Sequence, residues 1–205
     1  HIAAISSANY FAPRLLGTFH QRFPDVNVSI ETTNQAAVVK LVSENEVDMA
    51  IMGQPPDESH LEALEFMDNP LIIVAPPGHR LATRKRIALK ELEKEVFLIR
   101  EPGSGTRGAM QRFFREQKLK LTTGMEMGSL SGIKQGVQAG LGLGVLPRGA
   151  VQVELGLGNL VELKVKGLPI RRHWYVVLHK GKRLSVAAEE FKTLLTEEAV
   201  ELLSG

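Results

Sequence analysis

The sequence predicts an α/β fold of two similar units joined by two crossover strands. Apolar strand-like runs alternate with amphipathic helical segments in both halves of the chain, which is typical of parallel sheets with right-handed crossovers. The break Pro-Pro-Gly-His at 76–79 separates the two series. A late apolar strand around Trp174 then returns the chain to the first unit. We therefore assign residues 1–75 and 179–205 to one unit and residues 76–178 to the other.

The first unit begins with the order strand, helix, strand, helix, strand. Its second strand alternates apolar and polar side chains, as a half-exposed strand does. We expect Ser6 or Ser7 to cap its first helix, which tolerates Pro13 in its opening turns. The expected elements are strands at 1–5, 26–32 and 48–52, helices at 9–23 and 36–45, and short strands at 64–67 and 70–75 after a polar loop at 54–61.

The second unit repeats the alternation of strands and helices. One of its helices begins at Ser129 or Ser131 and ends at Gly140, and glycines spaced four apart on one face would let it lie close to a sheet. A closing helix at 185–195 belongs with the first unit. The other expected elements are a helical turn at 89–93, a helix at 109–117 and strands at 96–99, 123–127, 141–147, 160–165 and 174–178.

The stretch Glu-Pro-Gly-Ser-Gly-Thr-Arg at 101–107 joins an apolar strand to a helix start. The first N–H groups of a helix lack internal partners, and the helix dipole makes that end positive. Gly103 lets the backbone approach a ligand, Ser104 and Thr106 cap the helix or donate hydroxyls, and Arg107 adds a forked cation. The stretch therefore favours an anion or a polyhydroxylated small molecule. The alternative is a well-capped helix start with no ligand.

Polar residues recur where the strands of both units end. Ligands of open α/β sheets bind beyond the carboxyl ends of the strands, near helix N-termini. Four such corners are expected to line a ligand site: Ser6 with Ser7, Thr33 with Asn34, the loop from Gly103 through Ser104 and Thr106 to Arg107, and Ser129.

Composition excludes several classes of function. The formal net charge of +2 is too small for nucleic-acid binding by charge alone. We interpret the basic cluster at 80–86 as a solvated turn, with a basic patch as the alternative. The absence of cysteine excludes disulfides and thiol catalysis and fits a reducing compartment. No apolar run approaches the roughly 20 residues that a membrane helix needs, so we expect no membrane contact.

No catalytic, metal or cofactor motif is evident. The six histidines are dispersed without an HxxxH or HxH pair, and the GKS/GKT and GxGxxG patterns of nucleotide loops are missing. Glu101 is the one acid beside the glycine-rich loop, and we expect it to form an ion pair with Arg107 or Arg100. The sequence therefore predicts a binding module that is not an enzyme and that needs no cofactor or metal.

Five segments, in order and spacing, resemble the effector-binding domain of LysR-type transcriptional regulators. They are NYFAPRLL at 9–16, VDMAI at 47–51, REPGSGTR at 100–107, IKQGV at 133–137 and GLGLGVLP at 140–147. The resemblance covers essentially the whole chain. The segments at 100–107 and 172–177 look most like regulators of carbon-fixation operons.

This resemblance implies two Rossmann-like subdomains, similar to type II periplasmic binding proteins, with an effector in the interdomain cleft. The nine site residues named above would bind it: Ser6, Ser7, Thr33, Asn34, Gly103, Ser104, Thr106, Arg107 and Ser129. The effector would be a phosphorylated metabolite, a nicotinamide nucleotide or another anion. Members form homodimers, with the helix at 9–23 against a second-subdomain helix of the other chain, and tetramers when full-length. Their amino-terminal winged helix-turn-helix, which binds DNA, is absent from this sequence.

The leading hypothesis is thus a cytoplasmic ligand-sensing module of a transcriptional regulator. A solute-binding protein of the same fold is the alternative, and it would need an export signal. A dehydratase-like enzyme would need a paired acid and base, of which only Glu101 can be named.

Overall fold

A computed structural model describes residues 1–204 and divides the chain into two compact units. Unit 1 comprises His1–Asp68 and the chain from Arg172 onward, and unit 2 comprises Asn69–Arg171. The chain passes between the units twice, as the predicted fold class requires. Both boundaries lie earlier than the expected ones at 75/76 and 178/179. The reason is strand pairing, because the strand that precedes the Pro-Pro-Gly break pairs only within unit 2 and the Trp174 strand pairs only within unit 1.

The sheet of unit 1 is mixed. Its five strands, in the order β2-β1-β3-β10-β4, are β2 (Ile30–Thr33), β1 (Ile2–Ile5), β3 (Met49–Met52), β10 (His173–His179) and β4 (Leu61–Asp68). β1 runs parallel to β2 and β3, whereas β10 runs antiparallel to β3 and β4. β4 is longer than the predicted strand at 64–67 because it pairs with β10 along its whole length. β2 begins later than the predicted strand at 26–32 and lies at the sheet edge.

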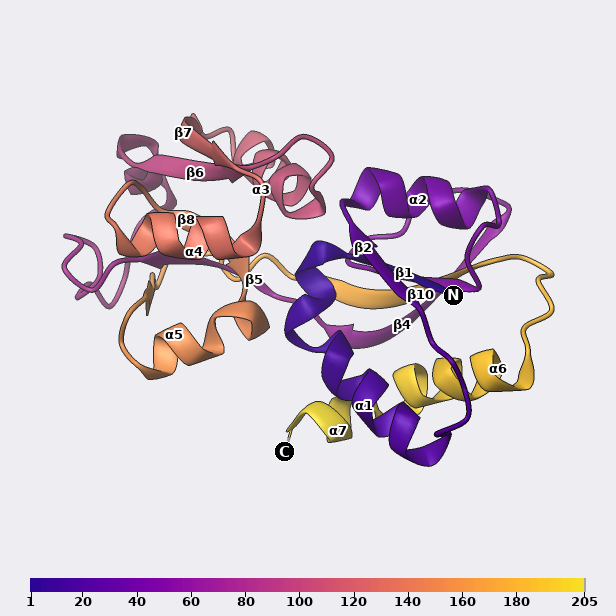
Figure 1. The fold of residues 1–205 in the computed structure, drawn as a ribbon. Helices are drawn as coiled ribbons and strands as arrows, with labels where there is room; N and C mark the ends of the chain where they lie inside the picture. The colour runs from indigo at the N-terminus through magenta and orange to yellow at the C-terminus, as the bar shows by residue number, and fades with distance from the viewer. Residues whose placement is uncertain (205) are drawn as a thin grey trace. The chain divides into compact units, whose positions relative to one another are not determined.

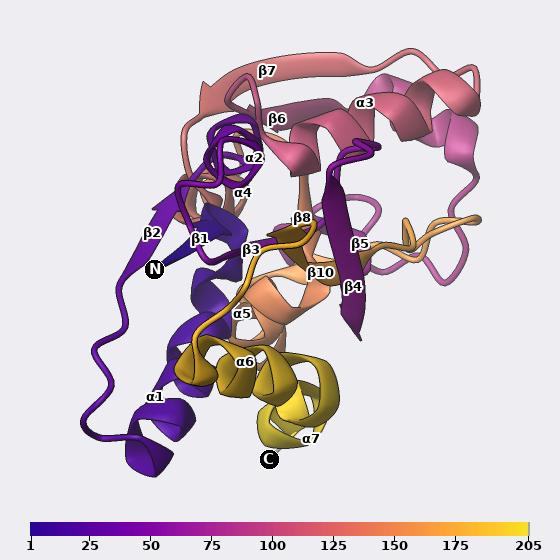
Figure 2. The same ribbon diagram turned by 90° about the vertical axis from the view of Figure 1, so that its right-hand side faces the viewer.

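Helices cover both faces of this sheet (Figure 1). α2 (Gln35–Ser43) lies on one face, and α1 (Ala12–Arg22), α6 (Val186–Thr193) and α7 (Ala199–Ser204) lie on the other. Figure 2 shows the last three grouped together. The closing helix extends past residue 195 because a π-helical segment, η4 (Leu194–Glu198), continues α6 into α7.

The predicted helix at 9–23 is two elements. A 3₁₀ helix, η1 (Ser6–Tyr10), precedes α1, and Phe11 separates them as the N-cap of α1 without a side-chain hydrogen bond. The expected cap by Ser6 or Ser7 is therefore wrong. Pro13 accounts for the late start of α1, because proline fits the first turn of a helix and breaks its interior.

Unit 2 contains a three-stranded and a two-stranded sheet. The antiparallel sheet has the order β8 (Gly144–Pro147), β5 (Leu71–Ala75) and β9 (Val161–Glu162), and the parallel sheet pairs β6 (Val96–Arg100) with β7 (Thr122–Met127). A parallel bridge between Phe97 and Leu143 connects the two. β9 is far shorter than the predicted strand at 160–165.

Side chains on alternate positions of β5 enter two different cores. Leu71 and Ile73 pack with α3 (Gly105–Glu116), whereas Ile72 and Val74 pack with α4 (Leu130–Gln138). The remaining helices of unit 2 are η2 (Leu89–Lys94), η3 (Arg148–Val151) and α5 (Gln152–Gly156). The predicted close approach of a glycine-bearing helix is confirmed at Gly136, where an added Cβ would lie 2.6 Å from Leu98 Cδ1.

Candidate functional site

In unit 1, the parallel register brings two of the predicted polar corners to one sheet edge. Ile5, the last residue of β1, lies opposite Thr33, the last residue of β2. η1 with Ser6 and Ser7 follows β1, and Asn34 follows β2. Ser7 is buried, while Ser6, Thr33 and Asn34 are half-buried. The two corners are therefore neighbours, as expected from parallel strands.

Asn34 is the N-cap of α2, because its Oδ1 accepts a hydrogen bond from the backbone N–H of Ala37 at 3.0 Å. The next residue, Gln35, donates from Nε2 to the backbone oxygen of Gln54 at 2.9 Å, which ties the loop after β3 to the same edge. Gln35 Oε1 is buried and accepts no hydrogen bond from the described residues. We did not predict Gln35 from sequence, although its place directly after a cap was a usable signal.

A buried aromatic cluster fixes the position of η1. The Nε1 of Trp174 donates a hydrogen bond to the Tyr10 hydroxyl at 3.1 Å, and the rings of Phe11 and Trp174 meet edge to face at 4.9 Å. Burial raises the pKa of the Tyr10 phenol above its ordinary value, and the hydrogen bond from Trp174 opposes this only in part. Tyr10 is thus neutral near pH 7. The turn that carries Ser6 and Ser7 is held in place by the packing of Tyr10 and Phe11 against Trp174.

In unit 2, the parallel pair β6 and β7 repeats the arrangement. Arg100 at the end of β6 lies opposite Met127 at the end of β7. α3 follows β6 with Ser104 as its N-cap, and α4 follows β7 with Ser129 as its N-cap. The N-termini of two helices therefore start from adjacent strand ends.

The hydrogen bonds that the two serine caps accept differ in length, and the two serines differ in exposure. Ser104 Oγ is buried and accepts from the N–H of Arg107 at 3.4 Å, whereas Ser129 Oγ is exposed and accepts from the N–H of Gly132 at 3.0 Å. Gly103 has a φ of +84°, a left-handed conformation that other residues rarely adopt. Thr106 is buried in the first turn of α3. The helix start predicted at 109 is thus wrong, because the cap at Ser104 starts α3 at Gly105.

Both arginines of this loop have carboxylate partners. The Nη1 of Arg107 donates to the backbone oxygen of Arg100 at 2.8 Å and to Glu126 Oε2 at 2.7 Å. Arg100, only 4% exposed, forms a two-pronged ion pair with Glu101 at 2.6 and 2.8 Å. Of the two partners expected for Glu101, the structure has Arg100. Sequence reasoning missed Glu126. It lies between two methionines in β7, and nothing in that pattern indicates a partner for Arg107.

This geometry offers backbone and hydroxyl donors at two helix N-termini beside a partly neutralised guanidinium. Such groups bind anions without any chemical step. Among residues 1–204, no three His, Asp or Glu side chains come together in a way that could hold a metal ion. In the same part of the chain, no helix is both long and apolar enough to cross a membrane.

The fold and these strand-end loops are those of a two-unit ligand-binding α/β domain. Comparison with protein families then identifies the family to which the domain belongs. The family model described as "LysR substrate binding domain" matches residues 1–200. The chain therefore belongs to the LysR substrate-binding domain family, which confirms the resemblance drawn from its motifs.

Proteins that are similar to this chain in sequence are transcriptional regulators. The chain is 44% identical over 201 residues to a RuBisCO operon transcriptional regulator of Allochromatium vinosum, covering 98% of this chain and 67% of that protein. It is 40% identical over 198 residues to the HTH-type transcriptional regulator CbbR of Rhodospirillum rubrum, covering 97% of this chain and 65% of that protein. The chain thus spans about two thirds of the length of these relatives. They confirm the predicted resemblance to regulators of carbon-fixation genes.

Solved structures agree with the fold. The regulatory domain of CcmR from Synechocystis PCC6803, in complex with 2-PG, has a TM-score of 0.91 and 38% identity, with 96% of each chain covered. The effector-binding domain of QuiR in complex with shikimate has a TM-score of 0.85 at 19% identity, with 98% of this chain and 96% of that chain covered. The second likeness shows the fold alone.

Proposed function

We propose that this chain senses a small phosphorylated carboxylate and that the protein to which it belongs uses this binding to control carbon-fixation genes. The observation that carries the proposal is the pairing of two helix N-termini, α3 and α4, at the adjacent ends of β6 and β7, with Arg107 beside them. The CcmR domain that binds 2-PG supports the ligand class, and we take 2-PG to be 2-phosphoglycolate. DNA binding would belong to a segment outside this sequence, as the relatives' description as HTH-type regulators suggests.

In unit 2, the anionic group would lie where the dipoles of both helices are positive. Ser104 and Ser129 hold the two helix starts in place, and Gly103 lets the backbone approach the ligand. Arg107 would add a charge-assisted hydrogen bond. Since its guanidinium already contacts Glu126, the anion shares Arg107 with that carboxylate.

In unit 1, Ser6, Ser7, Thr33 and Asn34 would act as neutral hydrogen-bond partners for hydroxyl and carboxyl oxygens. Their placement at one sheet edge supports this role. The effector would shift the protein toward the conformations that it binds best. Only a difference in affinity between conformations transmits such a signal, so the contacts must change between them.

Calorimetric titration of the chain with 2-phosphoglycolate tests the proposal. Arg107→Ala should weaken binding by about 1.5–3 kcal/mol, the usual value of a hydrogen bond to a charged group, which corresponds to roughly 10–150-fold in affinity. Arg115→Ala is the matched control, because Arg115 is exposed near the other end of α3. Unchanged affinity in Arg107→Ala, or equal losses in both variants, would mean that the 101–107 loop is structural. The same titration with a nicotinamide nucleotide tests the other effector class.

We further propose a homodimer in solution, a tetramer for the full-length protein, and action in the cytoplasm, where its DNA target would be. The relatives are regulators, which favours a sensor over a transport protein or an enzyme. Light scattering during size-exclusion chromatography would decide the oligomeric state, and a monomeric mass at micromolar concentration would contradict the dimer. Formation of a product from 2-phosphoglycolate would contradict the sensor.

A further inference from the structure

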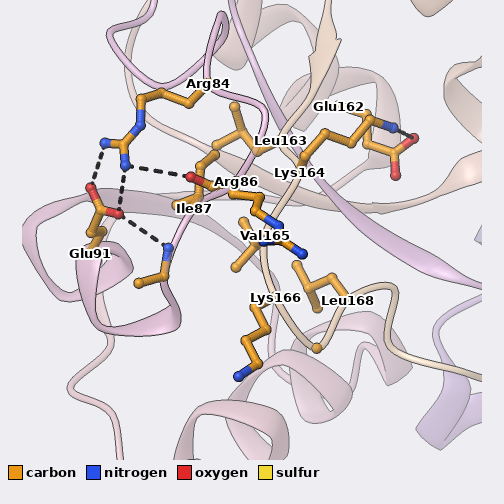
Figure 3. Close-up of a pocket in the computed structure, with 12 residues that line it drawn as sticks. Arg84, Arg86, Ile87, Glu91, Glu162, Leu163, Lys164, Val165, Lys166 and Leu168 are labelled. Atoms are coloured by element: carbon orange, nitrogen blue, oxygen red, sulfur yellow. Dashed lines mark hydrogen bonds and ion pairs between the residues drawn. The ribbon is translucent and has the colours of Figure 1, made fainter.

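Unit 2 has a cavity of about 700 Å³ that includes none of the residues assigned to the effector loops. It lies where the segment 84–91 meets the segment 162–168 (Figure 3). Ile87 and Val165 form a parallel bridge, with hydrogen bonds from the N–H of Ile87 to the oxygen of Lys164 and from the N–H of Lys166 to the oxygen of Ile87, both at 3.0 Å. We call it the basic cavity, because four cations line it against two carboxylates: Arg84, Arg86, Lys164 and Lys166 against Glu91 and Glu162.

One cation of the basic cavity, Arg84, is neutralised by an ion pair and has a structural role. Arg84 donates to both oxygens of Glu91, at 2.8 and 3.2 Å, and Glu91 also accepts from the N–H of Ala88 at 3.1 Å. These hydrogen bonds, the one from Ala88 first, hold the pKa of Glu91 below its ordinary value. Figure 3 shows this pair along one side of the cavity. The pair ties the turn at 84–88 to η2 and fixes one wall.

The other cations are less compensated. Within residues 1–204, the side chains of Arg86 and Lys166 make no ion pair and no hydrogen bond. Lys164 lies 3.5 Å from Glu162, but Arg148 takes the other oxygen of that carboxylate at 2.6 Å. Figure 3 shows Arg86 between the Arg84–Glu91 pair and the Lys164–Glu162 pair, with Lys166 below them.

The backbone beneath these cations is firmly held. Ile87, Leu163 and Val165 are buried in the core that packs against α3. The bridge between the two segments therefore sits on a packed layer, and the cations project from it into solvent. Their stems need little backbone rearrangement to converge on a ligand, which lowers the cost of binding.

We propose that the basic cavity binds the di- or triphosphate group of a small molecule. Its volume lies within the range of small-molecule sites, about 300–1,000 Å³. Its excess of cations requires a ligand with more than one negative charge, and arginine and lysine are the side chains that bind phosphate. A nucleic acid fits less well, because the whole chain carries only +2 and these cations surround a hollow instead of forming a stripe.

The sequence already marked this region through the basic cluster at 80–86, which we interpreted as a solvated turn. The turn is real, since 79–84 forms backbone turn hydrogen bonds. What the sequence could not show is that Lys164 and Lys166 join Arg86 from a segment far along the chain. The alternative, a basic patch, is thus the better description of Arg86, whereas Arg84 is paired with Glu91 and Lys85 does not line the cavity.

The test is a calorimetric titration of the chain with inorganic tripolyphosphate, ATP and orthophosphate at low and physiological salt. The double variant R86Q/K166Q should weaken tripolyphosphate binding at least about tenfold, the loss of one to two charge-assisted contacts. The control is K85Q/K90Q, which changes the net charge equally, in the same unit, at exposed residues that do not line the cavity. This control should stay within about twofold of the unmodified chain.

Equal binding of ATP and tripolyphosphate would assign recognition to the phosphates alone, and tighter binding of ATP would assign part of it to the nucleoside; both support the site. The proposal is overturned if the unmodified chain binds no tripolyphosphate at millimolar concentration, if orthophosphate binds equally tightly, or if the control variant loses as much affinity as R86Q/K166Q. Displacement of tripolyphosphate by a short DNA duplex would also overturn it, because the site would then serve a macromolecule.

Discussion

The carboxylate of Glu126 is expected to limit how strongly Arg107 attracts an anionic effector. Arg107 Nη1 lies 2.7 Å from Glu126 Oε2, and the two side chains are 24% and 50% exposed. An ion pair so exposed contributes only about 0–1 kcal/mol to folding stability. Glu126→Gln should therefore leave the fold intact while it removes a negative charge from the neighbourhood of the proposed site.

The size of the effect follows from Coulomb's law. An anion bonded to the far side of the guanidinium would lie about 6 Å from the Glu126 carboxylate, which gives a repulsion of roughly 1–3 kcal/mol for an effective dielectric constant between about 80 and 20. Glu126→Gln should thus bind 2-phosphoglycolate roughly 5–150-fold more tightly at low salt, with a smaller gain at high salt.

Calorimetric titration at two salt concentrations measures this gain. Glu116→Gln is the control, because it removes the same charge from an exposed position at the end of α3. If Glu126→Gln binds no more tightly than Glu116→Gln, the anion does not contact Arg107. If it binds more weakly, the carboxylate orients the guanidinium for the ligand, and the repulsion argument is refuted.

Two further predictions concern stability. Gly142→Ala should lower the free energy of unfolding by roughly 1–3 kcal/mol in a urea titration, because the new Cβ would lie 2.8 Å from the backbone oxygen of Val96, which is held by the bridge between the two sheets. Gly108→Ala should instead raise the free energy of unfolding by about 1 kcal/mol, because the new Cβ has open space around it and alanine favours a helix more than glycine does. Equal urea midpoints for the two variants would contradict the packing described for unit 2. Since the pKa of Glu91 is lowered in the folded state by Ala88 and Arg84, its contribution is present above its unfolded pKa and is lost as the pH falls through its folded pKa. The difference in melting temperature between the unmodified chain and Glu91→Gln should therefore shrink in acid, and a difference that is constant from pH 7 to strongly acidic pH would contradict the assignment.

Local signals in the sequence predicted helix caps at two of the four polar corners. Ser104 and Ser129, two of the predicted caps, are residue types that favour this position, and each accepts a hydrogen bond from the backbone N–H of the third residue of its helix. Asn34, for which the sequence predicts only a turn, caps α2 in the same way. The same reasoning failed at Ser6 and Ser7. A 3₁₀ helix intervenes there, and the helix begins only where Pro13 permits it.

Long-range contacts could not be predicted from local patterns. The ion pair between Arg107 and Glu126 joins a helix to a neighbouring strand, and nothing near either residue specifies the other. The unit boundaries failed for a similar reason. A proline- and glycine-rich turn is a strong local break, but the pairing of β5 with β8 and β9 decides which unit owns the strand before it.

The two units share one arrangement, a pair of parallel strands that end side by side, but differ in the charge of the residues that follow. In each, a parallel pair ends at matched residues, Ile5 with Thr33 in unit 1 and Arg100 with Met127 in unit 2, so the register of the strands makes the loops that follow neighbours. The polar residues that follow Ile5 and Thr33 are neutral, whereas the loops of unit 2 carry arginines balanced by Glu101 and Glu126. Parallel register thus brings the loops of the candidate site together, and we expect the balance of charge in unit 2 to set how strongly these loops attract an anion. Substitutions in the loops should therefore change affinity and ligand choice while leaving the sheets intact, whereas substitutions in the strands should change both together.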